Sequence, residues 1–198
     1  MKKMNLLSAS FLLAAVFILA SCSTSRTVER IDPSETIDLS GRWNDTDSRL
    51  VAEEMVNDAL NRPWRTRFET RNNREPVIVV GLVRNRSHEH IASETFIRNI
   101  ERSFINSGLI RLVVGGDARD ELREERADQT EFASESSAAR WAKELGADYI
   151  MQGTINSIVD SYRNRKTVTY QVNLSMTDIE TNEIVWLGEK AIKKFIEN

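Results

Sequence analysis

The chain has 198 residues, of which 40% are hydrophobic and 29% charged, a composition that indicates a globular protein and not a disordered one. Its formal net charge of −3 gives no indication of nucleic-acid binding. The single cysteine excludes both an internal disulfide and a zinc site of the Cys-rich kind. The length suits one domain and a further short segment.

The N-terminus has the pattern of a secretory signal. Lys2 and Lys3 form a basic start, and residues 6–20 are apolar apart from two serines. This run is shorter than the roughly 20 residues that a membrane-spanning helix needs. Residues 19–21, Leu-Ala-Ser, directly precede Cys22, and this sequence resembles the lipobox of bacterial lipoproteins.

The lipobox implies that Cys22 carries a membrane anchor. Its thiol would take a diacylglycerol, the signal peptide of residues 1–21 would be cleaved, and the new N-terminus would be acylated. Several acyl chains, at about 0.8 kcal/mol for each buried CH₂, hold a protein firmly on a membrane. Residues 22–39 are mostly small, polar or charged, so we interpret them as a lipidated tether of at most about 60 Å. An uncleaved anchor helix, or an ordinary signal with a leftover thiol, is the alternative.

Residues 40–198 are interpreted as a single domain, and its first half alternates helices with strands. The expected elements are a helix starting after Asp45 or Asp47, a short helix opened by Pro63, a strand over 77–83, a helix over 96–105 that Gly108 ends, and a strand over 110–114. A polar loop over 84–90 is expected to follow the first strand.

The second half begins with a charged stretch over 117–132, which favours a solvated helix or an exposed connection. A helix ending at Leu145 is expected next, followed by strands over about 149–159, 168–176 and 184–192. Gly153 within the first of them suggests a bulge or a close backbone approach. The order predicts an α/β fold with a mixed sheet of about five strands, an early parallel βαβ part and a late antiparallel meander, and helices packed on it.

Few residues suggest chemistry. His88 and His90 flank a glutamate in a polar loop, but no cysteine or third histidine completes a metal set, so a loop role is favoured over a metal or catalytic role. No Gly-x-Ser-x-Gly or phosphate-loop motif is present. We therefore expect no cofactor, no metal and no small-molecule substrate.

Basic and aromatic residues are the other candidates. Arginines cluster after the first helix, where they suit an acidic partner or lipid head groups, although a solvated helix face with Trp64 and Phe68 in the core is favoured. The clustered arginines are Arg62, Arg65, Arg67, Arg71 and Arg74. The four tryptophans are Trp43, Trp64, Trp141 and Trp186, and they are expected to be core residues.

Several segments together resemble the LpoB family of penicillin-binding-protein activators. They are DLSGRWNDTDSRLVAEEM (38–55), VRNRSHEHI (83–91), EERADQTEFAS (124–134), ELGADYIMQGTINSI (144–158) and TDIETNEIVWLGEKAIKK (177–194). The strand motif GADYI-x-x-G is also similar to CsgG-type secretion subunits and the TolB amino-terminal domain. The resemblance covers nearly all of the chain after the tether.

The resemblance implies a non-catalytic α/β domain that stimulates a bifunctional peptidoglycan synthase, a penicillin-binding protein, by contact. It implies outer-membrane anchoring through Cys22 with the domain in the periplasm, and Ser23 in place of an aspartate fits that membrane. The tether is shorter than the Pro-rich arm of the best-known member. No partner-contacting residue carries over from the family.

The leading hypothesis is a lipoprotein that regulates cell-wall synthesis by binding a penicillin-binding protein. A CsgG-like secretion or assembly lipoprotein of the cell envelope is the first alternative. A hydrolase that uses His88 or His90 is the second.

Overall fold

The computed structural model describes residues 27–32, 35–113 and 146–197. Contacts divide the chain into residues 1–35 and a compact unit over 36–198, which contains every helix and strand described here. The elements are α2 (Asp45–Leu60), α3 (Pro63–Asn72), β1 (Val77–Arg86), α4 (Ser93–Ser107), β2 (Arg111–Leu112), β3 (Tyr149–Tyr162), β4 (Arg165–Asp178) and β5 (Ile184–Glu197). The predicted signal peptide, Cys22, the charged stretch and the helix ending at Leu145 lie outside the described residues.

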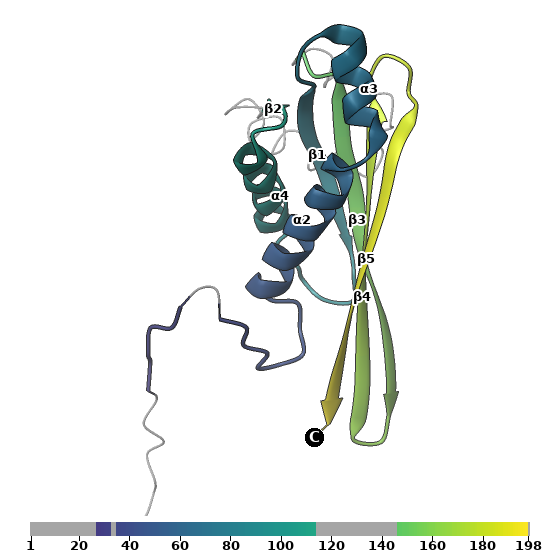
Figure 1. Cartoon of the computed structure of the whole chain (residues 1–198). Helices are drawn as coiled ribbons and strands as arrows, with labels where there is room; N and C mark the ends of the chain where they lie inside the picture. Colours follow the sequence, from purple (N-terminus) through teal and green to yellow (C-terminus); the bar gives the residue numbers. More distant parts are fainter. Residues whose placement is uncertain (1–26, 33–34, 114–145, 198) are drawn as a thin grey trace, which may run out of the picture. The chain divides into compact units, whose positions relative to one another are not determined.

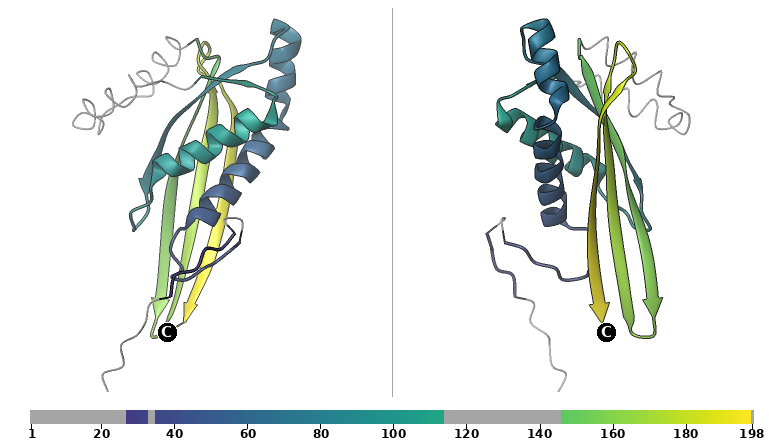
Figure 2. Two further views of the ribbon diagram at one scale, coloured as in Figure 1. Left: turned by 90° about the vertical axis from the view of Figure 1, so that its left-hand side faces the viewer. Right: turned by 45° about the vertical axis from the view of Figure 1, so that its right-hand side comes forward.

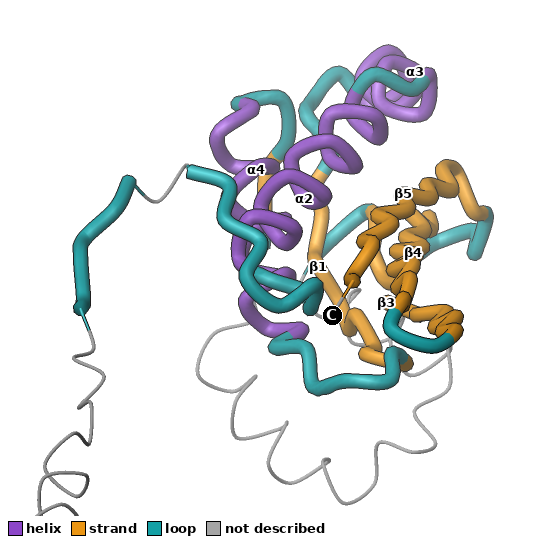
Figure 3. The backbone as a smooth tube through the Cα atoms, turned by 90° about the horizontal axis from the view of Figure 1, so that it is seen from below, coloured by secondary structure: helices purple, strands orange, loops and turns teal. Residues whose placement is uncertain are grey.

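The five strands form one sheet in the order β2-β1-β3-β4-β5. β1 pairs in parallel with β2 and β3, whereas β3, β4 and β5 form an antiparallel meander. The predicted mixed sheet is therefore confirmed. The described helices all cover one face of it, and the lower ends of β3, β4 and β5 extend past them (Figures 1 and 2). Figure 3 shows the same grouping of helices on one side of the strands.

Helix boundaries follow local sequence signals. Pro63 is the first residue of α3, and Gly108, with a φ of 65°, ends α4, both as predicted. The predicted caps of α2 are wrong, because Asn44 is the N-cap. Its side chain accepts a hydrogen bond from the Asp47 backbone N–H at 2.9 Å, and the Asp47 carboxylate accepts one from the Asn44 N–H at 3.0 Å. This reciprocal capping box places Asp47 in the first turn, where a negative charge also favours the helix dipole.

Four of the five strands are longer than predicted, whereas β2 covers only Arg111–Leu112 of the strand predicted over 110–114. β1 continues to Arg86 through the segment expected to be a loop, because residues 84–86 pair with residues 154–156 of β3. β5 likewise continues past Ile192 to Glu197. Polar side chains interrupt the hydrophobic pattern of the sequence, but they do not end the strand. A strand end predicted from that pattern therefore comes too early where the strand is exposed to solvent.

The hydrophobic core lies between the helices and the sheet. Alternate residues of β4 face it, and they are Val168, Tyr170, Val172, Leu174 and Met176. Gly153 makes the close backbone approach that the sequence suggested, because a Cβ there would lie 2.1 Å from the carbonyl oxygen of Asn173. The bulge itself lies opposite, on β1 between Val80 and Val83. Across the part of the chain that the structure describes, no helix is long and apolar enough to span a membrane.

Candidate partner-binding surfaces

The two histidines lie after β1 and are exposed. The His88 ring nitrogen Nδ1 is 2.7 Å from the Ser157 hydroxyl oxygen, which also accepts a hydrogen bond from the His88 backbone N–H at 2.9 Å. The ring stacks against Tyr170 at a centroid distance of 6.2 Å. Within the described residues no group of acidic, cysteine or histidine side chains is arranged to hold a metal ion. The contacts of His88 thus fasten the loop after β1 to the meander.

Glu89, between the histidines, joins three distant parts of the domain. Its carboxylate accepts hydrogen bonds from the Trp43 backbone N–H at 2.8 Å and from the Tyr170 hydroxyl at 2.7 Å. Burial raises the pKa of Tyr170 above its ordinary value, and the hydrogen bond to Glu89 raises it further. The sequence pattern indicated Glu89 only together with the histidines, because its partners Trp43 and Tyr170 lie far away in the chain.

Lys194 fixes the segment before α2 to β5. Its side chain is 8% exposed, and its ammonium nitrogen lies 2.6 Å from carboxylate oxygens of both Asp38 and Asp47. It also donates to the Arg42 carbonyl at 3.0 Å. Burial alone lowers the pKa of Lys194, but the hydrogen bonds to Asp38 and Asp47 outweigh it and raise that pKa above 10.5. The N-terminal segment is therefore held near the C-terminal end of β5.

Three of the five clustered arginines form ion pairs within the domain. Arg65 meets Glu69 at 2.8 Å, Arg62 meets Asp58, and Arg74 binds both carboxylate oxygens of Asp148 at 2.7 Å. The hydrogen bond from Arg74 to Asp148 raises the pKa of the arginine. These ion pairs stabilise the chain just before β1 and β3 and the junction between α2 and α3.

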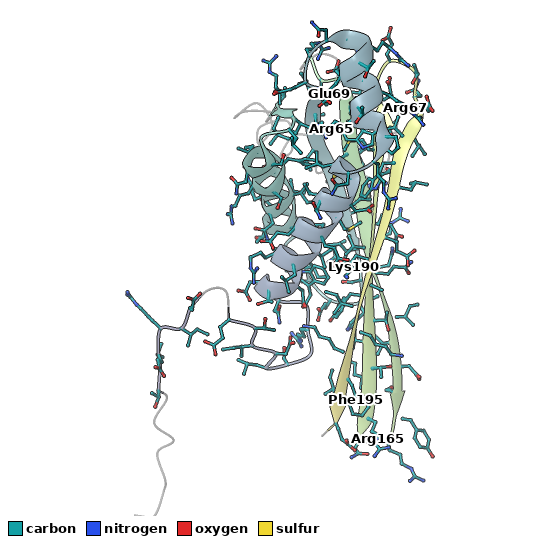
Figure 4. The ribbon with its side chains drawn as sticks, viewed as in Figure 1. Arg65, Arg67, Glu69, Arg165, Lys190 and Phe195 are labelled. Atoms are coloured by element: carbon teal, nitrogen blue, oxygen red, sulfur yellow. The ribbon has the colours of Figure 1, made fainter. Side chains whose placement is uncertain are left out.

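The other two arginines, Arg67 and Arg71, are exposed on α3 and form no ion pair with the described residues. We call this pair the arginine ridge. Trp64 and Phe68 are 4% and 8% exposed, as predicted for the core side of α3, and helical spacing places Arg67 and Arg71 beside that side, three residues after each. Figure 4 shows Arg67 at the end of the domain away from Phe195 and Arg165. Because the N-terminal segment is fixed at Lys194, beside Phe195, the ridge lies at the end of the sheet away from that attachment.

The remaining tryptophans are structural where they are described. Trp186 is buried, and its indole N–H donates to the Asp58 carboxylate at 2.8 Å, which lowers the pKa of Asp58. Trp43 is half-buried and packs edge-on against Phe96 and Tyr170. Trp141 lies outside the described residues. The expectation of core tryptophans is thus confirmed for Trp64 and Trp186.

Large apolar side chains are exposed on the sheet face that points away from the helices. Leu187 and Phe195 of β5 are 71% and 62% exposed, and Ile158 and Tyr162 of β3 are similarly open. β5 is the outermost strand, so one of its sides carries unpaired backbone groups within the described part of the molecule. The unpaired edge of β5, with Leu187 and Phe195 exposed along it, is therefore a second candidate for an interaction surface.

A comparison with models of known protein families shows which family this chain belongs to. The family model of the peptidoglycan-synthase activator LpoB matches residues 47–192. This chain belongs to the LpoB family. The family description is one of a regulatory activator and not of a catalyst, and it makes a peptidoglycan synthase the kind of partner involved.

Solved structures of LpoB share the fold of this LpoB-family protein. The C-terminal domain of LpoB from Escherichia coli is 20% identical, with a TM-score of 0.51, and the match covers 74% of this chain and 98% of that domain. The NMR structure of E. coli LpoB is 17% identical, with a TM-score of 0.51, over 90% of this chain and 84% of that one. A comparison with curated protein sequences gives no match. The predicted family and fold are therefore confirmed.

Proposed function

We propose that this LpoB-family protein is a lipoprotein of the outer membrane that activates a bifunctional penicillin-binding protein from the periplasm and has no catalytic activity of its own. The family match over residues 47–192 carries this proposal. The proposed mechanism is allosteric: the domain binds one conformation of the synthase better than another and shifts its population. A coupling free energy of about 1–3 kcal/mol changes activity by several-fold to about a hundredfold.

The proposed anchor is a lipid on Cys22, followed by the tether of residues 22–39. An extended tether reaches at most about 60 Å. The domain adds to this reach, because the chain enters it near Lys194 and Arg67 of the ridge lies beside the other end of β5. The ten residues of β5 between Lys194 and Ile184 span roughly 33 Å. An extended tether and the length of β5 together allow a separation of up to roughly 90 Å between the ridge and the proposed anchor.

The arginine ridge is the surface that we propose for the synthase. Arginine is favoured at protein interfaces, and a positive surface increases the rate of association with an acidic partner. Arg67 and Arg71 are suited to this role because they are exposed and unpaired among the described residues, whereas their neighbours on α3 are committed to ion pairs. The partner surface should therefore be acidic.

Charge reversal of the ridge tests the proposal. We expect the double variant Arg67→Glu/Arg71→Glu to lose capture of the penicillin-binding protein from native envelopes, because two attractive contacts become repulsive. The full-length chain is the bait, and labelled penicillin identifies the synthase in the bound fraction. Capture should also weaken as the salt concentration rises.

The matched control is Arg102→Glu/Arg111→Glu, which makes the same charge change at exposed sites on α4 and β2. It should keep capture near the wild-type level. Equal losses in the two double variants would show that net charge, and not the ridge, governs binding. Absence of any synthase from the wild-type fraction would contradict the proposed partner.

A further inference from the structure

The exposed face of β5 has a self-complementary sequence. Reading along the strand, the residues that point away from the helices are Leu187, Glu189, Ala191, Lys193 and Phe195. The pattern is apolar, acidic, small, basic and apolar, and all five side chains are exposed. When this series of five residues is read in the opposite direction, apolar residues again stand at both ends, and the acidic and basic residues exchange positions.

We propose that β5 pairs antiparallel with β5 of a second copy of this chain, about a two-fold axis through Ala191. In that register Ala191 faces its own copy, Glu189 faces Lys193 of the second copy, and Leu187 faces Phe195. Opposite charges and apolar pairs directly across a strand pair each stabilise it. The two sheets become one continuous sheet, and the interface is isologous.

Other registers lose the complementarity. Moving the axis by two residues along β5 places Glu189 opposite Glu189, or Lys193 opposite Lys193. Like charges directly opposite each other are destabilising. Moving it by one residue places Lys190 or Ile192 on the axis, and Leu187 then faces a charged residue. Among the registers with the axis between Glu189 and Lys193, the sequence of β5 thus favours the one centred on Ala191.

Among the described residues no strand covers this edge, and residues 38–41 and 193–197 line one hollow at its C-terminal end. Among the described residues β5 pairs only with β4, so alternate backbone groups along its other side have no strand partner. The segment before α2 contacts Lys194 and Ile196, whose side chains point toward the helices, and leaves Phe195 62% exposed. Lys190 and Lys194 keep their own-chain partners Glu54 and Asp47, so the pairing breaks no ion pair.

The pairing is independent of the proposed synthase contact. It uses the outer edge of the sheet, whereas the arginine ridge lies on α3. A failure of either test therefore leaves the other inference standing.

Disulfide capture at the axis tests the pairing. Directly opposed residues of an antiparallel pair have Cα atoms about 4.5–5.5 Å apart, within the range that a disulfide bridges. We expect the full-length Ala191→Cys variant to form a covalent dimer with diamide as the oxidant. Gln171→Cys is the matched control, because Gln171 is the cross-strand neighbour of Ala191 on β4, one strand inside the edge. The wild-type chain shows what Cys22 alone contributes.

Charge exchange tests the register. In the Ala191→Cys background, Glu189→Lys should lower the dimer yield at least about fivefold, because lysine then faces lysine twice. The combined Glu189→Lys/Lys193→Glu exchange should restore it. A yield for Ala191→Cys no higher than for Gln171→Cys would overturn the pairing. Failure of the exchange to restore the yield would overturn the register.

Discussion

Replacing Gly153 with alanine is expected to lower the free energy of unfolding by about 3 kcal/mol, at the upper end of what overpacking costs. The added Cβ would lie 2.1 Å from the Asn173 carbonyl oxygen and 2.5 Å from a methyl carbon of Leu174. The first of these contacts is with backbone, so no side-chain rotation relieves it, and β3 must separate from β4. For a domain of this size the melting temperature should fall by roughly 10 °C.

Thermal and urea denaturation of the two proteins measure this effect. Thr169→Ala is the matched control, because Thr169 lies on β4 with its side chain on the solvent face of the same sheet. Its free energy of unfolding should stay within about 0.5 kcal/mol of the wild-type value. A Gly153→Ala protein as stable as the control would show that the strands accept a side chain at this crossing.

Replacing Lys194 with methionine is expected to lower the free energy of unfolding by about 3 kcal/mol, because the change removes one partner of a buried ion cluster. Asp47 is buried and would lose its ammonium partner, and the segment around Asp38 would lose its attachment to β5. Lys193→Met, measured at a protein concentration at which the chain is monomeric, is the control, since the Lys193 side chain is exposed in the single chain. Chemical denaturation at neutral pH compares the two. Equal effects would contradict a structural role for the Lys194 cluster.

The difference in the free energy of unfolding between the wild type and Lys194→Met should depend on pH. The hydrogen bond from Lys194 lowers the pKa of Asp38 below 3.8, and the two aspartates raise the pKa of Lys194 above 10.5. The unfolded chain therefore takes up a proton on Asp38 before the folded chain does as the pH falls. The cluster contributes fully between about pH 5 and 9. The stability difference between wild type and Lys194→Met should shrink as the pH falls through the folded-state pKa of Asp38, and again as it rises through that of Lys194.

Local signals in the sequence predicted the elements well. Pro63 and Gly108 mark helix ends through their own backbone preferences, and the alternation along β4 identifies its core face. Gly153 indicated a close approach because a glycine inside a strand loses stability unless something requires the space. Each of these signals depends on a residue and its immediate neighbours.

The contacts that build the surfaces were not predictable in this way. Lys194 and Asp38 are separated by more than 150 positions, and nothing local distinguishes Lys194 from the exposed Lys193. The arginines after α2 look alike in sequence, yet Asp148 takes Arg74 whereas Arg67 stays free of ion pairs with the described residues. The unpaired edge of β5 follows from the strand order, which only the assembled sheet determines.

The rate at which a purified penicillin-binding protein polymerises glycan strands, measured with and without the full-length chain, tests the central claim most directly. The wild-type chain should raise the rate several-fold, and Arg67→Glu/Arg71→Glu should leave it at the level of the synthase alone, whereas Arg102→Glu/Arg111→Glu should activate like the wild type. An unchanged rate with the wild-type chain, under conditions where it binds the synthase, would contradict an activating role.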